Sequence, residues 1–153
     1  MMWFRVDNRL IHGQVIETWL PYIGASRLVV CSAALAADPF RRQIMLLAVP
    51  SRITVDFCTL TALLDMYVAD DPSRRTLVLF AGCDDARAAF DFGVSFTSLN
   101  IGNVHYAPGK TQVCAHVALS EKDAEHLAYL RDRGVALDFR CVPNDKTQVE
   151  ALP

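Results

Sequence analysis

The sequence contains no apolar stretch long enough to cross a membrane, and its N-terminus lacks the layout of a signal peptide. Lysine and arginine are scattered and the formal net charge is −2, so the chain has no basic run typical of nucleic-acid-binding proteins. It also shows no internal repeat, no low-complexity tract and no linker that would separate domains. These absences predict a soluble, cytoplasmic protein with one domain over residues 1–153 and no nucleic-acid partner.

Cysteine pairs and glycine fingerprints are absent as well. The five cysteines lie far apart without a Cys-x-x-Cys pair, and several fall within or beside apolar runs, which predicts buried free thiols. No Gly-x-Gly-x-x-Gly segment is present, which argues against dinucleotide binding. We therefore expect neither a metal ion nor an organic cofactor.

What the chain does have is a globular balance of 52% apolar and 21% charged residues over 153 residues, enough to bury one core. Strand-like and helix-like segments alternate along it. The expected strands cover residues 2–6, 27–31, 53–57, 76–80, 98–101, 111–119 and 135–142. The expected helices cover 14–20, 38–48, 59–68, 84–90 and 120–133. This alternation predicts an α/β protein with a single open, mostly parallel, Rossmann-like sheet and helices on both faces.

Local signals set the ends of these helices. Asp38 and Thr59 are candidate N-caps, and Asp84 or Asp85 can cap the helix through residue 90. The segment 120–123 opens the last helix with an acidic first turn. Pro21 is expected to stop the first helix.

In an open parallel sheet, the working site lies at the carboxyl ends of the strands. Loops 31–37, 81–83, 102–109 and 143–145 follow expected strands and could share one edge with the loop after the first strand. His12 is in that first loop, just before a helix begins. Backbone N–H groups at a helix N-terminus favour anions, phosphate above all.

The segment around His12 is suited to phosphoryl transfer. A neutral imidazole is an effective nucleophile, and a histidine side chain in water has a pKa of about 6.5. Arg9 offers a planar guanidinium matched to phosphate oxygens, although a surface salt bridge is its ordinary alternative. The backbone N–H groups of Leu10, Ile11, Gly13 and Gln14 can donate further hydrogen bonds to the phosphate oxygens.

The remaining polar residues of the loop have supporting parts. Asp7 and Asn8 are suited to orient the loop through backbone hydrogen bonds, or one of them fixes the His12 tautomer. Gln14 is equally suited to a hydrogen bond at the helix start or to a partner contact. Transfer from one imidazole to another can proceed on these donors, so the chemistry demands no metal ion.

Three segments resemble one known family. Residues 5–15, Arg-Val-Asp-Asn-Arg-Leu-Ile-His-Gly-Gln-Val, closely resemble the opening of the IIB component of the mannose/fructose/sorbose family of the bacterial phosphotransferase system (PTS). Residues 99–105, Leu-Asn-Ile-Gly-Asn-Val-His, are similar to its Asn-hydrophobic-Gly-Gly segment. Residues 140–145, Arg-Cys-Val-Pro-Asn-Asp, are similar to its Val-Pro-x-Asp segment. The resemblance covers the chain from end to end.

The resemblance implies a cytoplasmic phosphocarrier. His12 would accept a phosphoryl group on Nδ1 from the phosphohistidine of a IIA protein. It would then pass the group to a sugar bound by the membrane units IIC and IID, so the sugar is an indirect partner. Arg9 would also help to dock phospho-IIA. Whether the chain forms a homo-oligomer is left open.

The chain departs from the family at three places. Asn8 replaces the more usual second Asp, and Asn103 stands where Gly is usual. In residues 31–38, where the family usually has an acidic or amide residue followed by another Asp or Asn, only Asp38 is retained. Asp38 and His105 are secondary candidates for the site. Because of these departures, a regulatory phosphohistidine module of an incomplete PTS, not coupled to sugar transport, remains an alternative. A non-catalytic binding domain is a third.

Overall fold

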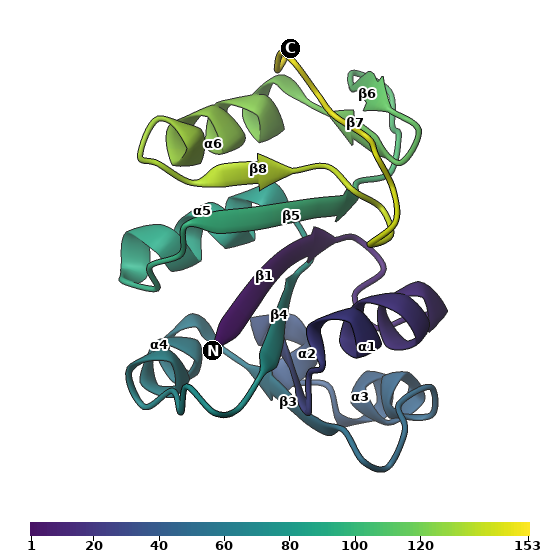
Figure 1. The fold of residues 1–153 in the computed structure, drawn as a ribbon, viewed down its shortest axis with the longest axis vertical. Coiled ribbons are helices and arrows are strands. Elements are labelled where there is room, and N and C mark those ends of the chain that lie inside the picture. Colours follow the sequence, from purple (N-terminus) through teal and green to yellow (C-terminus); the bar gives the residue numbers. More distant parts are fainter.

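The structure is a computed structural model that describes all 153 residues, and its centre is a six-stranded parallel sheet (Figure 1). The strand order is β3-β2-β4-β1-β5-β8, and every neighbouring pair is parallel. The strands are β1 (Met2–Asp7), β2 (Arg27–Cys31), β3 (Thr54–Cys58), β4 (Thr76–Phe80), β5 (Ser98–Asn103) and β8 (Ala136–Asp138). The prediction of an open, parallel α/β sheet is confirmed.

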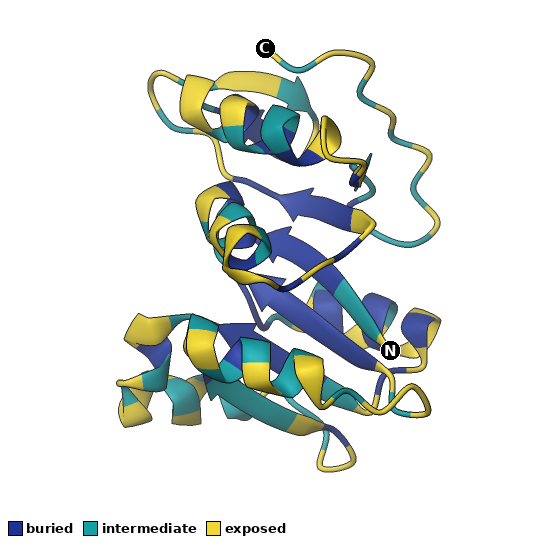
Figure 2. Cartoon of the chain, turned by 90° about the vertical axis from the view of Figure 1, so that its left-hand side faces the viewer, coloured by how far each residue is buried: buried dark blue, intermediate teal, exposed yellow.

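Helices cover both faces of this sheet, as predicted. They are the π-helix η1 (Val15–Trp19), α1 (Leu20–Ile23), α2 (Ala33–Ala36), α3 (Pro39–Leu46), α4 (Leu60–Val68), α5 (Cys83–Phe92) and α6 (Glu121–Arg131). One hydrophobic core joins the sheet to η1, α1 and α2, and a second joins the opposite face to α4, α5 and α6. In Figure 2 the central strands are dark blue between helices whose outer faces are yellow. No helix has the length and apolar character needed to span a bilayer.

Side-chain caps set the starts of three helices as predicted. The Asp38 carboxylate accepts the backbone N–H of Arg41 at 3.1 Å at the start of α3. The Thr59 hydroxyl accepts a backbone N–H in the same way at α4, and Ser120 forms a reciprocal capping box at α6.

Two predictions about helix ends are wrong. Pro21 does not stop the first helix, because η1 runs directly into α1 and Pro21 is the second residue of α1. The helical segment ends instead at Gly24, whose φ of +68° suits a residue without a side chain. Neither Asp84 nor Asp85 caps α5, since the N-cap is Gly82 and both aspartates lie within the first turn.

The predicted strands after residue 103 also need correction. Residues 111–119 form an antiparallel hairpin, β6 (Thr111–Cys114) and β7 (Val117–Leu119), in place of one strand. The last strand is short because residues 139–142 leave the sheet, where the carbonyls of Arg140 and Cys141 accept side-chain hydrogen bonds instead. The short α2 helix was not predicted from the sequence, and β5 continues two residues further than predicted.

The strand order reverses beside the first strand. After β1 the chain crosses to β2 on one side of it, whereas β5 and β8 lie on the other side. Such a reversal is where open α/β sheets bind their ligands, outside the carboxyl ends of the strands. The loop from Asn8 to Gln14 leaves β1 at this point (Figure 1).

Candidate functional site

The loop that holds His12 is anchored by buried apolar side chains and a strained turn. The side chains of Leu10 and Ile11 are buried in the same core as Val15 of η1. Leu10 has a φ of +58°, the left-handed conformation that a leucine rarely adopts, and it is the only non-glycine residue with positive φ. Backbone strain of this kind is typical of functional sites, where the surrounding packing maintains it.

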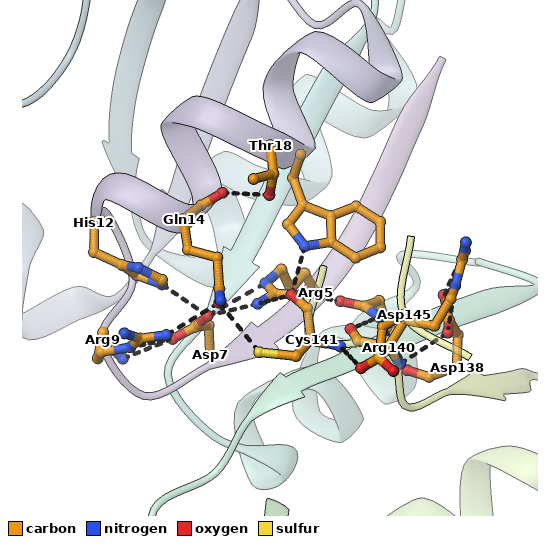
Figure 3. Close-up of polar contacts among 12 residues, drawn as sticks. Arg5, Asp7, Arg9, His12, Gln14, Thr18, Asp138, Arg140, Cys141 and Asp145 are labelled. Atoms are coloured by element: carbon orange, nitrogen blue, oxygen red, sulfur yellow. Dashed lines mark hydrogen bonds and ion pairs between the residues drawn. The ribbon is translucent and has the colours of Figure 1, made fainter. Parts of the chain in front are cut away.

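Asp7 is the centre of the site (Figure 3). Its side chain is fully buried at the end of β1, and its Oδ2 atom lies 2.9 Å from Nε2 of His12 and 2.8 Å from Nη2 of Arg5. Its Oδ1 atom accepts the backbone N–H of Arg9 at 3.0 Å. Burial alone would raise the pKa of Asp7, but the hydrogen bond with His12 and the charge of Arg5 outweigh it and lower this pKa. Asp7 is therefore an ionised acceptor.

This arrangement sets the tautomer of His12. A carboxylate can only accept, so the imidazole donates Nε2–H to Asp7 and leaves the lone pair on Nδ1. The imidazole side chain of His12 is 15% exposed, against 0% for Asp7. Of the two residues considered from the sequence, Asp7 makes this contact and Asn8 does not.

Arg5 lies behind Asp7 and is completely buried. Its guanidinium also donates to the Oδ1 atom of Asn100 and to the carbonyl oxygen of Cys141, and it lies 5.1 Å from the ring centre of Trp19. Burial lowers the pKa of Arg5, partly opposed by the charge of Asp7. Arg5 thus connects the His12 site to β5 and to the loop after β8.

Arg9 and Gln14 lie on the open side of His12. The Nη2 atom of Arg9 donates to Oε1 of Gln14 at 3.1 Å, and its Nε atom lies 3.7 Å from Oδ1 of Asp7. The side chain of Arg9 is 39% exposed, so part of its guanidinium faces solvent. Gln14 does not cap the helix with its side chain; its amide oxygen also accepts the thiol of Cys141 at 3.3 Å.

A row of unpaired backbone donors completes the site. The backbone N–H groups from Ile11 to Val15 donate to no acceptor in the protein, and the first hydrogen bond of the helix runs from Ile16 N to His12 O at 3.1 Å. Space around Gly13 is open, since a Cβ atom there would meet nothing within 4 Å. Free N–H groups at a helix N-terminus form an anion-binding surface. These donors come from the same loop that carries His12.

Asn8 joins three of the loops that were expected to share this edge. Its side-chain amide donates to the carbonyl of Ala81 after β4 at 2.7 Å, and its side-chain oxygen accepts the backbone N–H of His105 after β5. Its own backbone N–H donates to the carbonyl of Asn103 at 3.0 Å. The loops after β1, β4 and β5 therefore meet, and the loop after β8 joins them through Cys141.

The two secondary candidates are placed differently. His105 lies beside the site, but only its backbone contacts Asn8, and its side chain is exposed without a hydrogen bond. Asp38 caps α3 and makes no hydrogen bond to the His12 loop. No three His, Cys, Asp or Glu side chains gather in a way that could hold a metal ion.

Sequence reasoning missed the support behind Asp7, namely Arg5, Trp19, Asn100 and the carbonyl of Cys141. One signal was available, because Arg5 is the only charged residue among Met2–Val6. A charged residue in a buried strand requires a partner. Asp7, the counter-charge, is two residues away, but the other partners, Asn100 and Cys141, lie 95 and 136 residues further along the chain, and no local pattern points to them.

The fold and the site define an open parallel α/β protein with free backbone N–H donors at the carboxyl end of its first strand, and comparison with known proteins gives the family. The family model of the PTS system sorbose subfamily IIB component matches residues 1–151. The chain belongs to this family of sugar-specific IIB components. The predicted membership of the mannose/fructose/sorbose group is confirmed.

Several named relatives are similar over most of the chain. The sorbose-specific EIIB component of Klebsiella pneumoniae is 32% identical over 142 residues, covering 92% of this chain and 87% of the relative. The mannose-specific EIIAB component of Escherichia coli strain K12 is 34% identical over 144 residues. That match covers 92% of this chain but 44% of the relative, so the chain spans less than half of the EIIAB protein.

Solved structures agree with the fold. The crystal structure of the N-acetylgalactosamine-specific IIB component 1 from Escherichia coli has a TM-score of 0.91 at 28% identity, covering 100% of both chains. The IIB domain of the sorbose permease from Klebsiella pneumoniae has a TM-score of 0.86 at 30% identity, covering 97% of this chain and 93% of that one.

Proposed function

We propose that this chain is a phosphocarrier in which His12 accepts a phosphoryl group on Nδ1 from a IIA phosphohistidine and transfers it to a sugar bound by IIC and IID membrane units. The observation that supports this most is the 2.9 Å contact between Asp7 Oδ2 and His12 Nε2, which leaves Nδ1 as the nucleophile. The relatives named as mannose-, sorbose- and N-acetylgalactosamine-specific components support the assignment to sugar transport. The proposed place of action is the cytoplasmic side of the membrane.

In the first transfer, the Nδ1 lone pair of His12 forms a bond to phosphorus as the P–N bond of the donor histidine breaks. The proton on Nε2 stays in the hydrogen bond with Asp7, whose negative charge stabilises the positive phosphorylated ring. Charge on the phosphoryl oxygens is stabilised by Arg9 and by the free N–H groups of residues 11–15. The loop thus orients the nucleophilic nitrogen and also stabilises the charges that develop on the ring and on the phosphoryl oxygens.

In the second transfer, a sugar hydroxyl oxygen attacks phosphorus and the P–N bond to His12 breaks. The electron pair returns to Nδ1, and the proton of the sugar hydroxyl passes to water or to a base outside this chain. The imidazole regains its neutral form with Nε2–H still directed at Asp7. These steps need the residues of this chain to orient one ring and to bind phosphate, and they need no metal ion.

A regulatory phosphohistidine module is the alternative. It is supported by the segment after β2, where residues 33–36 form the short helix α2 with no polar side chain. In that case His12 is still phosphorylated, but its state would change partner binding instead of supplying a sugar.

Intact-mass analysis tests the proposal. The protein is incubated with phosphoenolpyruvate, the general phosphotransferase proteins and a mannose-family IIA, and wild type is compared with His12→Ala and with His116→Ala as the matched control. We expect an acid-labile gain of one phosphoryl group in wild type and His116→Ala and none in His12→Ala. No gain with a charged IIA would overturn the proposal and favour a binding domain.

The sugar step is then tested separately. Phosphorylated protein is added to membranes that contain IIC and IID units, and sugar phosphate is measured. Formation of sugar phosphate supports transport, whereas stable phosphoprotein with no transfer supports the regulatory module.

A further inference from the structure

A cavity of about 580 Å³ lies at the amino ends of the strands, away from His12. It opens because β1 and β5 diverge: all of Met2–Val6 pairs with β4, but on the other side only Arg5–Asp7 pairs with β5 (Figure 1). The residues Met2–Phe4 and Ser95–Ser98 form its two sides. Its volume is in the range of small-molecule sites in proteins.

Aromatic side chains dominate the walls of this cavity. Six of them contribute, from β1, the helical segment η1–α1, α4 and the turn before β5: Trp3, Phe4, Trp19, Tyr22, Tyr67 and Phe96. Three of the six, Phe4, Trp19 and Phe96, are more than 90% buried; Phe4 and Phe96 stack on each other, and Arg5 lies over the ring of Trp19. The rings of Trp3, Tyr22 and Tyr67 are not fully buried, so these are the ones that an occupant can contact, and a flat aromatic ring favours a ligand with an apolar face of its own.

The charged groups of the lining are already neutralised. Arg5 is paired with Asp7, and Arg140 donates to both carboxylate oxygens of Asp138 at 2.9–3.1 Å. The carboxylate of Asp70 lies 2.8 Å from the amino group of Met1. No cation or anion in the lining is left without a counter-charge, so the cavity has no built-in preference for a charged ligand.

The hydrogen-bonding groups that remain free are neutral. The hydroxyls of Ser95, Thr97 and Ser98 at the rim make no hydrogen bond within the protein, and neither does the indole N–H of Trp3. Aromatic walls with free hydroxyls and one free indole N–H suit a neutral ring that has hydroxyls at its edge and C–H groups on its face.

We propose that this cavity binds a free, neutral monosaccharide without phosphorylating it. This goes beyond the proposed phosphoryl transfer, because the cavity lies at the opposite end of β1 from His12 and contains no nucleophile of that site. An occupant of the cavity would contact Arg5, whose guanidinium also donates a hydrogen bond to Asp7. The side chain of Arg5 therefore lies between the cavity and the His12 site.

Intrinsic fluorescence tests the proposal directly, since the chain has two tryptophans and both line the cavity. The full chain is titrated with D-mannose, D-fructose, L-sorbose and N-acetylgalactosamine, and isothermal titration calorimetry is run on any sugar that changes the emission. We expect a saturable change in the millimolar range for at least one sugar, and affinity at least tenfold weaker for its phosphate ester. No saturable change with any sugar, or tighter binding of the phosphate ester, would overturn the proposal.

Variants link binding to the cavity. Ser98→Ala and Thr97→Val each remove one neutral hydrogen bond, and each is expected to raise the dissociation constant of the sugar about fivefold to tenfold. Ser51→Ala, an exposed serine in the turn before β3, is the matched control and should bind like wild type. Trp3→Phe leaves Trp19 as the only fluorescent tryptophan, so its emission shows whether Trp19 alone responds to the sugar. Equal affinity in all four variants would place the sugar elsewhere and overturn the proposal.

The His12→Ala variant separates this proposal from the proposed function. It should bind the sugar like wild type while failing to take up phosphate. Loss of sugar binding in His12→Ala would assign the sugar to the phosphoryl site and overturn the cavity proposal. Phosphate uptake by wild type without sugar binding would overturn the cavity proposal alone.

Discussion

Gly102 in β5 and Arg5 in β1 lie so close together that a Cβ atom at residue 102 would be 1.9 Å from Cζ of Arg5. The φ angle of Gly102 is not positive, so space and not backbone conformation requires glycine here. Because no side chain occupies this position, the guanidinium of Arg5 can lie flat against β5 and reach Asp7. The orientation of His12 therefore depends on a residue 90 positions further along the chain.

We expect Gly102→Ala to destabilise the fold by about 1–3 kcal/mol, since the new methyl group must displace a buried side chain. Urea denaturation followed by circular dichroism measures the change. Gly13→Ala is the control, because a Cβ atom there meets nothing within 4 Å, and its effect should stay within about 0.5 kcal/mol. Equal stability of the two variants would contradict the packing argument.

The relation between Gly102 and Arg5 shows what sequence could and could not predict. The strands and the capped helices follow local periodicity and cap residues, so most were predicted, and the position of His12 at a strand–helix turn follows from the same signals. The hairpin β6–β7 was missed because alternation alone does not show where a strand reverses. The network behind Asp7 joins residues from β1, β5 and the loop after β8, and such contacts exist only once the sheet is assembled.

Asp7→Asn should be strongly destabilising at neutral pH. It removes the counter-charge of the buried Arg5, and breaking one partner of a buried pair costs about 3–5 kcal/mol. Chemical denaturation at pH 7 measures the loss. Asp138→Asn, which affects the half-buried pair with Arg140, is the control and should cost no more than about 1 kcal/mol. If both variants lost the same unfolding free energy, burial of the Asp7–Arg5 pair would not be the cause of the destabilisation.

The same carboxylate predicts a dependence on pH. Because the pKa of Asp7 is lower in the folded chain than its ordinary value of 3.8, its ionised form adds stability that is fully present above pH 3.8. That contribution is lost as the pH falls from 3.8 through the lower pKa that Asp7 has in the folded chain. The difference in unfolding free energy between wild type and Asp7→Asn should therefore be constant from about pH 5 to about pH 7, because this carboxyl group is ionised there in both the folded and the unfolded chain. It should shrink at a pH of about 3 and below. A difference that grows on acidification would contradict the lowered pKa.

The cysteines should react according to burial. Four of the five are buried and Cys114 is half-buried, and burial raises the pKa of the Cys83 and Cys141 thiols. The thiolate is the form that attacks Ellman's reagent, so one cysteine should react quickly in the native protein and all five in urea. Cys114→Ala should abolish the fast phase. A fast phase that persists in this variant would identify an accessible thiol elsewhere.

Arg9→Ala should slow phosphoryl transfer from phospho-IIA by about 10²-fold or more if Arg9 stabilises transition-state charge in the way an oxyanion donor does. Its guanidinium is partly exposed beside His12 and contacts Gln14, so removal leaves the fold intact but takes away the one cation on the open side of the ring. Rapid-quench measurement of acid-labile phosphate gives the rate.

Two further variants interpret that result. Arg9→Lys keeps the charge but loses the planar fork, so its rate should fall between those of wild type and Arg9→Ala. Arg52→Ala, an exposed arginine just before β3 at the other edge of the sheet, should transfer at the wild-type rate. If Arg9→Ala also transfers at the wild-type rate, Arg9 only holds Gln14, and the row of free N–H groups from Ile11 to Val15 must bind the transferred phosphoryl group alone.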